Sequence, residues 1–269
     1  MNIQPLNPAD LNAANQLKPE GWGDILDSLT FYSHSPFCFP MKVMIEDRIA
    51  GIGTSIVHGN SAWLAHIIVH PDFRKQGIGH FITQTLVDRL HQQRIETIYL
   101  IATDLGEPVY RKLGFTTEAE YAFFKGVSLK SGRLNAPLSD SVFNYTVEFK
   151  KQVLNLDREH SGEERLKLLE PHLENGLVYL NGSVAEGFYL RTLGEGMIIA
   201  STQEAGIDLL KLRFRTNEIA AFPVDNLSAV SFMQTHDFSS FKTAKRMRLG
   251  IKRKWNPEAN FNRIGGNLG

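Results

Sequence analysis

The alternation of apolar and polar residues is clearest between residues 62 and 90. Trp63–Val69 is an apolar run with β-branched residues and the length of a buried strand. Pro71 ends this strand, because proline has no amide hydrogen to give to a strand ladder. Farther on, four apolar residues recur at helical spacing, at Phe81, Ile82, Leu86 and Leu90. The pattern predicts a central strand, a loop and an amphipathic helix.

Shorter patterns predict the neighbouring elements of the first half of the chain. The expected strands are Asn2–Leu6, Met41–Ile45, Ile49–Val57, Thr97–Ala102 and Glu120–Leu129. The expected helices are one that begins at Pro8, Trp22–Leu29 and Glu107–Leu113, and Phe31–Pro40 is expected to be an aromatic loop. Gly51 and Gly53 fall inside a predicted strand and indicate a bend or a bulge.

A similar order of elements returns in the second half of the chain. Residues 130–141 contain glycine, proline and several serines, and we interpret them as a linker. Val224–Phe238 mirrors Thr103–Phe115, and aligning the final phenylalanines sets Met233 opposite Tyr110. The same alignment sets Asp237 opposite Gly114. We therefore expect two domains, residues 1–129 and residues 142–269.

Composition agrees with two domains, because 269 residues are many for one compact domain. The 29 basic and 29 acidic residues balance, so net charge gives no reason to expect a nucleic-acid partner. The first residues do not resemble a secretory signal, and no apolar run is long enough to span a membrane. The single cysteine, Cys38, fits a reducing compartment and a buried position between two phenylalanines. We expect a cytoplasmic protein without a membrane partner or a metal site.

The loop between the predicted strand and helix has the chemistry of a phosphate site. The first amides of a helix have no partners within it and lie at the positive end of its dipole. Gly77 and Gly79 carry no side chains, so a phosphate can approach these amides closely. Arg74 and Lys75 add positive charge. We expect a diphosphate to bind here. The loop lacks the G-K-[ST] of a P-loop nucleotidase, so that class of enzyme is not expected.

These residues resemble the acetyl-CoA signature of the GNAT (GCN5-related N-acetyltransferase) superfamily, Q/R-x-x-G-x-G/A. The signature is intact as Arg74-x-x-Gly77-x-Gly79, and Val69-His70-Pro71 matches the usual end of the preceding strand. A second segment, Leu100–Phe115, ends in YRKLGF and is similar to the Y-x-K-x-G-F of the same superfamily. The resemblance is strongest over residues 62–115.

The resemblance implies an α/β fold with two GNAT-like domains, each a mixed central β-sheet flanked by helices. It also implies an acyltransferase that moves an acetyl group directly from acetyl-CoA to an amine. Tandem relatives have a divergent second half, and here residues 201–206 keep one glycine, no basic residue and one acid. We expect this second half to be degenerate. Ile101 replaces an acid common in such relatives, and a non-catalytic acyl-CoA-binding or scaffold protein is the alternative.

The resemblance also assigns cofactor residues. The pantetheine arm is expected along the backbone of Ile67, Ile68 and Val69, through hydrogen bonds like those of a β-strand. Thr103 lies where many relatives have an asparagine that contacts the cofactor, and its hydroxyl either replaces that contact or caps a helix. The full expected set is Ile67, Ile68, Val69, Arg74, Lys75, Gln76, Gly77, Ile78, Gly79, His80 and Thr103.

Two residues are candidates for proton transfer. Tyr110 matches the superfamily's general acid, because a neutral phenol can donate to a departing thiolate; the other reading is a tyrosine packed in the core. His66 is the candidate base, with a buried histidine or a water chain as alternatives. Strand alternation predicts that His66 and Trp63 point to opposite faces. His70, beside Pro71, is expected to have no catalytic role.

The acceptor side is defined least. Phe31, Tyr32, His34 and Phe37 lie where GNAT enzymes build the acceptor pocket, but aromatic residues there also serve packing. Arg111 and Lys112 either form a solvated helix face or contact the cofactor phosphates. The expected partner is an amine on a small molecule or a peptide, and the sequence leaves small amines, amino acids, antibiotics and protein N-termini open.

Overall fold

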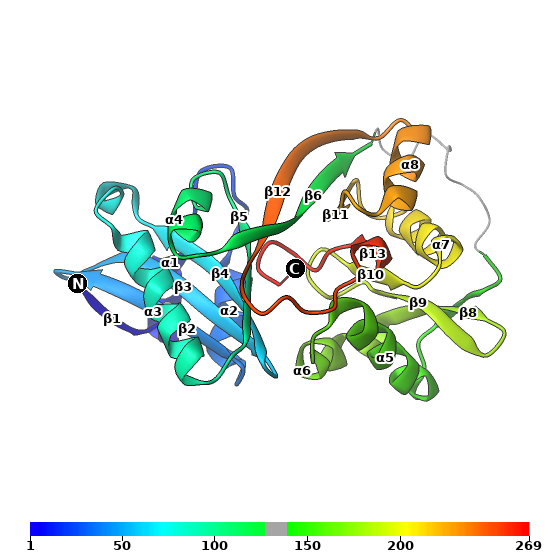
Figure 1. The fold of residues 1–269 in the computed structure, drawn as a ribbon, viewed down its shortest axis with the longest axis horizontal. Coiled ribbons are helices and arrows are strands. Elements are labelled where there is room, and N and C mark those ends of the chain that lie inside the picture. Colours follow the sequence, from blue (N-terminus) through cyan, green and yellow to red (C-terminus); the bar gives the residue numbers. More distant parts are fainter. Residues whose placement is uncertain (127–138, 269) are drawn as a thin grey trace. The chain divides into compact units, whose positions relative to one another are not determined.

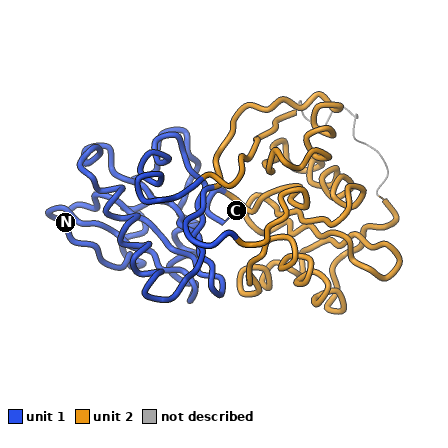
Figure 2. Tube along the Cα trace, viewed as in Figure 1, with its two compact units in different colours: residues 1–116, 247–252, 266–268 blue, residues 117–246, 253–265, 269 orange. Residues whose placement is uncertain are grey.

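A computed structural model describes residues 1–126 and 139–268 of the chain (Figure 1). These residues form two compact units (Figure 2). Unit 1 contains residues 1–116, 247–252 and 266–268, and unit 2 contains the described residues between 117 and 246 together with residues 253–265. Most of the predicted linker, residues 130–141, and the predicted domain end at residue 129 lie outside the described residues.

Unit 1 begins with an edge strand and two helices, followed by an antiparallel series of strands. Its helices are α1 (Leu11–Asn15), α2 (Leu26–His34), α3 (Ile78–Gln92) and α4 (Glu107–Lys112). Its strands are β1 (Asn2–Pro5), β2 (Cys38–Ile45), β3 (Arg48–His58), β4 (Ser61–Val69) and β5 (Thr97–Ala102). Strands β1 to β4 pair antiparallel in sequence order, and β4 pairs parallel with β5. The sheet is therefore mixed, as predicted.

Unit 2 repeats this order of elements. Its helices are α5 (Lys150–Ser161), α6 (Leu166–Leu169), α7 (Gln203–Arg213) and α8 (Leu227–Thr235). The strands that follow Thr116 are β6 (Thr116–Lys125), β7 (Val142–Asn144), β8 (Gly176–Asn181), β9 (Val184–Leu190), β10 (Met197–Ala200), β11 (Ile219–Pro223), β12 (Ser239–Gly250) and β13 (Asn260–Asn262). The series from β1 to β6 and the series from β7 to β12 thus both read strand, two helices, three strands, helix, strand, helix, strand. Two GNAT-like repeats are confirmed at the level of the fold.

The last strand of each repeat does not stay with its own repeat. The described strands form one sheet in the order β1-β2-β3-β4-β5-β12-β6-β11 and a second in the order β13-β10-β9-β8-β7. Strand β6 pairs with β11 in unit 2, whereas residues 247–250 at the end of β12 count with unit 1. There the amide of Ile251 donates to the carbonyl of Glu96, and Met247 is fully buried in the core.

The core of unit 1 lies between α3 and the sheet. Ile78, Ile82, Leu86 and Leu90 form the buried face of α3. A Cβ atom at Gly53 would lie 2.6 Å from Cγ2 of Ile82, so this glycine lets the helix lie close to β3. Helices α1 and α2 pack on the sheet through β3 and β2 and lie on the other side of it from α3 (Figure 1).

Two local expectations were wrong. The helix expected at Trp22–Leu29 instead spans Leu26–His34, because Ile25, Leu29 and Tyr32 are all buried at helical spacing. The expected aromatic loop is therefore mostly helix, and β2 begins three residues earlier than predicted, at Cys38. In the second half, the short helix α6 is followed directly by a 3-10 turn, Glu170–Asn175.

Candidate active site

The centre of the candidate site is a bulge in β4. Ile52 pairs with Ile68 and Thr54 with Ala65, so Gly53 of β3 lies opposite two residues of β4, His66 and Ile67. His66 has a φ of +46°, a left-handed conformation that is uncommon outside glycine. Backbone outliers of this kind cluster at functional sites, where surrounding structure holds them.

The bulge decides which way His66 points. Leu64, Ile67 and Val69 all pack in the core beneath α3. The extra residue, His66, is therefore placed on the other face of the sheet, where its ring meets that of Tyr32 of α2. Trp63, which precedes Leu64, is on that same face and packs on Tyr99. The expectation that His66 and Trp63 point to opposite faces is wrong because plain alternation does not count the bulge.

Beyond the bulge, β4 has an open edge. Its parallel pairing with β5 runs from Ser61 to Trp63, and among the described residues no strand pairs with that side of β4 beyond Trp63. The amide of His70 donates to the carbonyl of Ala50 in β3. Alternation then directs the amides of Ile67 and Val69 to the open edge and that of Ile68 to β3. An extended ligand can hydrogen-bond to this edge as an added strand would.

The loop after β4 presents unpaired amides. Lys75 and Gly77 have φ values of +61° and +81°, so the backbone curls around a concave space in the manner of an anion-binding nest. Gly77 is the N-cap of α3, whose 15 residues supply a full helix dipole. Within residues 1–126 and 139–268, the amides of residues 75–80 have no hydrogen-bond acceptor. The loop therefore fits a diphosphate.

The two glycines serve the loop differently. A Cβ atom at Gly77 would meet nothing within 4 Å, but its left-handed φ favours glycine. A Cβ atom at Gly79 would make only an ordinary contact, 3.6 Å from Cγ2 of Val69. Because the protein itself leaves room at both positions, the absence of side chains keeps space for a ligand.

Side chains around the loop have distinct roles. Nε of Arg74 donates to the carbonyl of Val69 at 3.2 Å, which ties the exposed guanidinium to the end of β4. Lys75 and His80 are exposed, whereas the side chain of Ile78 is buried, so only the amide of Ile78 is available to a ligand. Nε2 of Gln76 donates to the carbonyl of Asp72 and fixes the turn.

His70 holds the start of this loop. Its Nδ1 accepts a hydrogen bond from the amide of Asp72, and the carboxylate of Asp72 forms an ion pair with Arg48 at 2.9 Å. The hydrogen bond from Arg48 is the main reason that the pKa of the exposed Asp72 lies below its usual value. These contacts fit the expectation that His70 has no catalytic role.

Tyr110 lies in α4 and is buried, with 8% of its surface exposed. It packs in the core cluster that contains Leu64 and Ile78, on the α3 side of the sheet, and so on the face opposite His66. Burial raises the pKa of Tyr110 to about 12, so the phenol is neutral at neutral pH. Its hydroxyl makes no hydrogen bond to any residue that the structure describes. A neutral phenol with a free proton is suited to act as a general acid.

Thr103 and Arg111 take part in local contacts around α4. The hydroxyl of Thr103 accepts a hydrogen bond from the amide of Gly106 at 3.2 Å, in the turn that leads into α4, whose N-cap is Gly106 itself. Arg111 forms an ion pair with Glu107 one turn earlier, at 2.7 Å. A Cβ atom at Gly106 would lie 2.7 Å from the ring of Tyr110, so this glycine makes room for the tyrosine.

The candidate base is weakly basic in this environment. Burial lowers the pKa of His66 to about 4 from an ordinary 6.5. An alkylammonium acceptor has a pKa of about 10, so taking its proton would be uphill by about 8 kcal/mol, at about 1.4 kcal/mol per pKa unit. Nδ1 of His66 also lies 2.8 Å from the hydroxyl of Tyr32. The geometry therefore favours a hydrogen-bonding role for His66 over general-base catalysis.

The second repeat shows what a closed version of this site looks like. Met233 stands where the first repeat has Tyr110, and Asp237 has a φ of +63° where Gly114 has +88°. Asn226 caps α8 by accepting from the amide of Ala229, and Thr103 likewise accepts from the amide three residues on, in the turn before α4. The backbone geometry around α8 thus agrees with the predicted alignment to α4, but the second repeat has no tyrosine at the position of Tyr110.

In the second repeat, the strand edge that corresponds to the open edge of β4 is covered by the chain itself. Strand β10 corresponds to β4, and its free side pairs with β13, through Ile198 with Asn262 and Ile199 with Asn260. Phe261 of β13 packs on α7, since a Cβ atom at Gly206 would lie 2.2 Å from its ring. At the start of α7, the Thr202 hydroxyl donates to the carboxylate of Glu186, which would repel a phosphate.

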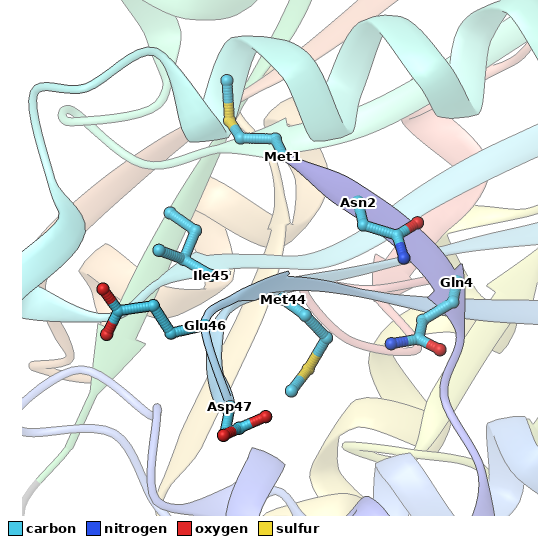
Figure 3. A pocket seen from close by; sticks show the side chains of 7 residues that line it. All are labelled: Met1, Asn2, Gln4, Met44, Ile45, Glu46 and Asp47. Carbon is cyan, nitrogen blue, oxygen red and sulfur yellow. The ribbon is translucent and has the colours of Figure 1, made fainter.

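An open hollow elsewhere in unit 1 contains none of the predicted site residues. It measures about 550 Å³ and lies at the edge strand β1 and the β2–β3 turn (Figure 3). The residues that line it are Met1, Asn2, Gln4, Met44, Ile45, Glu46 and Asp47. Its two carboxylates make it unsuited to a diphosphate, and it is not the candidate site.

The fold and the loop of unit 1 define an acyltransferase domain, and comparisons with known proteins agree. Residues 31–131 match the model of the Acetyltransferase (GNAT) domain. The [ribosomal protein bS18]-alanine N-acetyltransferase of Salmonella typhimurium is 27% identical over 117 residues, which cover 42% of this chain and 79% of that protein. An uncharacterized N-acetyltransferase of Porphyra purpurea is 35% identical over 63 residues, 23% of this chain and 36% of that protein.

Two solved structures extend the likeness of the fold to both repeats. A proposed acetyltransferase from Pyrococcus horikoshii superposes with a TM-score of 0.84 at 19% identity, covering 100% of this chain and 95% of that one. A GCN5-related N-acetyltransferase from Anabaena variabilis gives a TM-score of 0.61 at 9% identity, covering 93% and 73%. Residues 31–131 thus match a GNAT acetyltransferase domain, both repeats share the fold of these two structures, and the comparisons support an acyltransferase. No described helix has both the length and the apolar character needed to cross a membrane.

Proposed function

We propose that the protein transfers an acetyl group from acetyl-CoA directly to the amine of an acceptor. The observation that carries this proposal is the set of unpaired amides at residues 75–80, curled by two left-handed residues at the start of α3. An anion of the size of the CoA diphosphate fits this loop, and Arg74 and Lys75 supply positive charge beside it. The remaining expected contacts come from the amides of Gln76, Ile78, Gly79 and His80.

The open edge of β4 continues the same binding surface. The amides of Ile67 and Val69 point to this edge, where a pantetheine arm would add to the sheet, with Ile68 between them. The thioester would then lie near the bulge, where β4 and β5 separate. Thr103 remains a proposed contact through its backbone, because its hydroxyl already accepts from the amide of Gly106.

The chain's part in the chemistry follows from which groups hold protons. The amine nitrogen attacks the thioester carbon, the carbon–sulfur bond breaks, and the sulfur leaves as a thiolate. Tyr110 donates its phenolic proton to that thiolate and recovers a proton from solvent. Since His66 is a poor base, we propose that water takes the proton of the attacking amine.

The acceptor is an amine on a small molecule or a peptide. The Salmonella relative named above acts on the alanine of a ribosomal protein, so a peptide with an N-terminal alanine belongs in the test panel. The experiment incubates the full-length protein with acetyl-CoA and a panel of amino acids, alkylamines, aminoglycosides and peptides, and detects the free thiol. Amine-dependent thiol release with a matching acetylated product is expected. Binding of CoA by calorimetry without release on any amine would contradict the proposal and favour a CoA-binding scaffold.

A further inference from the structure

Three side chains form a hydrogen-bonded chain that ends at the β4 bulge. Nδ2 of Asn267 donates to the hydroxyl of Tyr32 at 2.6 Å, and that hydroxyl lies 2.8 Å from Nδ1 of His66. The segment Gly266–Leu268 counts with unit 1, and Leu268 anchors it with only 5% of its surface exposed. A segment that lies 235 residues beyond Tyr32 in the sequence thus reaches the expected acceptor side of the site.

The direction of the hydrogen bonds follows from counting donors. An amide nitrogen has only hydrogens to give, so the oxygen of Tyr32 accepts from Asn267. Burial raises the pKa of the Tyr32 phenol, so the phenol keeps its own hydrogen at neutral pH. The phenolic hydrogen is then left for Nδ1 of His66. In the opposite direction, the ring would donate to an oxygen that already accepts from Asn267, and the phenolic hydrogen would lose its ring-nitrogen acceptor.

A ring that accepts at Nδ1 carries its own hydrogen on Nε2. Nε2 of His66 has no hydrogen-bond partner among the described residues, and the side chain is only half-buried. Beside it lies the exposed ring of Trp22, with the two ring centroids 6.0 Å apart in an edge-on arrangement. His66 therefore offers one N–H group next to an apolar wall, on the face of the sheet opposite Tyr110.

We propose that His66 donates its Nε2–H to an oxygen of the acceptor, and that Asn267 is a positioning residue that keeps His66 in this tautomer. The inference rests on the proposed acetyl transfer and deepens it by naming the acceptor class. A suitable acceptor carries a carbonyl oxygen close to its amine, as an amino-acid amide or a peptide N-terminus does. A simple alkylamine offers no such oxygen.

Asn267→Asp tests this directly, because a carboxylate can only accept hydrogen bonds. The hydroxyl of Tyr32 would then donate to Asp, and Nδ1 of His66 would have to donate to Tyr32. Nitrogen-15 NMR of the histidine rings is expected to show Nε2–H for His66 in the native protein and Nδ1–H in the variant. Asn155→Asp, an exposed position in α5, adds the same charge as a control and should leave the His66 signal unchanged. A native ring protonated on Nδ1 would overturn the inference.

Kinetics provide the second readout. For a peptide acceptor, Asn267→Asp is expected to raise KM about tenfold, the loss of about one hydrogen bond, with kcat within about twofold. For an alkylamine of equal length, KM should not change, and the affinity for CoA should be native for both. A native protein that uses both amines equally would overturn this inference alone. A native protein that binds CoA but acetylates neither amine would overturn the proposed function with it.

Discussion

Replacing Gly77 by glutamate separates the effect of backbone strain from the effect on an anion site. Gly77 has a φ of +81°, and Gly182, in the β8–β9 turn of unit 2, has a φ of +61°. A Cβ atom at either glycine would meet nothing within 4 Å, and both residues are exposed. Each Gly→Glu variant should therefore lose a similar stability, about 1–2 kcal/mol for a side chain in the left-handed region.

Only the variant at Gly77 places a carboxylate where the diphosphate is proposed to bind. Two unit charges 4 Å apart repel by about 1 kcal/mol in water and by about 4 kcal/mol at an effective dielectric constant of 20. With two phosphate charges, the lower limit is about 2 kcal/mol, which corresponds to a rise in Kd of about 30-fold. The glutamate also fills the space that the ligand needs, so the measured loss should exceed this limit.

Titration calorimetry with CoA and thermal melts of the three proteins provide the assay. We expect Gly182→Glu to bind CoA like the native protein and to melt at the same temperature as Gly77→Glu within a few degrees. Native affinity in Gly77→Glu would refute the phosphate loop. An equal loss of affinity in both variants would show that lowered stability, not the loop, is responsible.

Three further outcomes follow from the same geometry. Tyr110→Phe removes the only proton that the phenol can donate, so kcat should fall about 100-fold while the Kd of CoA stays native; unchanged turnover in the thiol assay would exclude Tyr110 as the acid. Calorimetry should give one CoA per chain, because β13 occupies the free side of β10; a stoichiometry of two would contradict this. Burial lowers the pKa of His66 to about 4 from 6.5. Between these two pH values the unfolded chain binds a proton at this ring and the folded chain does not. The free energy of unfolding should therefore fall by at most about 3 kcal/mol as the pH drops from about 6.5 to about 4. Urea melts of the native protein and of His66→Gln should differ in this pH window, and parallel curves would disprove the buried, neutral ring.

Local sequence was sufficient for the strand β4, the glycine loop and the helix α3. The information lies in about thirty consecutive residues: a β-branched run, a proline, two glycines and a helical stripe. Each of these acts on its own backbone, and the structure has the strand, the loop and α3 in that order. The same holds after α4 and after α8, where Gly114 and Asp237 respectively take the left-handed conformation that the alignment of the repeats implies.

The direction of His66 depends on pairing, which is not a local property. A bulge exists only relative to a partner strand, and the signal for it lay in β3, at Gly53, rather than in β4. Counting alternation along β4 alone therefore gave the wrong face. The sequence of β3 indicates an irregularity at Gly53, but it does not show which residues of β4 lie opposite this glycine.

Other features were missed because their residues are distant in sequence or polar. Helix α5 carries few apolar side chains, and part of its buried face is polar, with Asp157 and His160 both buried. The ion pair between Asp157 and buried Arg165 compensates for this burial, and a hydrophobic pattern cannot reveal it. Strand β13 and Asn267 lie after β12, in residues that have no counterpart in the first repeat. Only the folded chain therefore shows that β13 pairs with the free side of β10 and that Asn267 reaches Tyr32.

Because the end of β12 belongs to unit 1 and β6 pairs with β11 in unit 2, neither unit is one continuous segment of the chain. The core of unit 1 includes Met247, which is synthesised about 145 residues after the end of β5. During translation, one edge of β5 stays unpaired until the end of β12 emerges. A fragment cut between the repeats would keep the whole glycine loop before α3 yet lack one strand of its sheet, so we expect it to aggregate unless a peptide spanning residues 239–252 is supplied in trans.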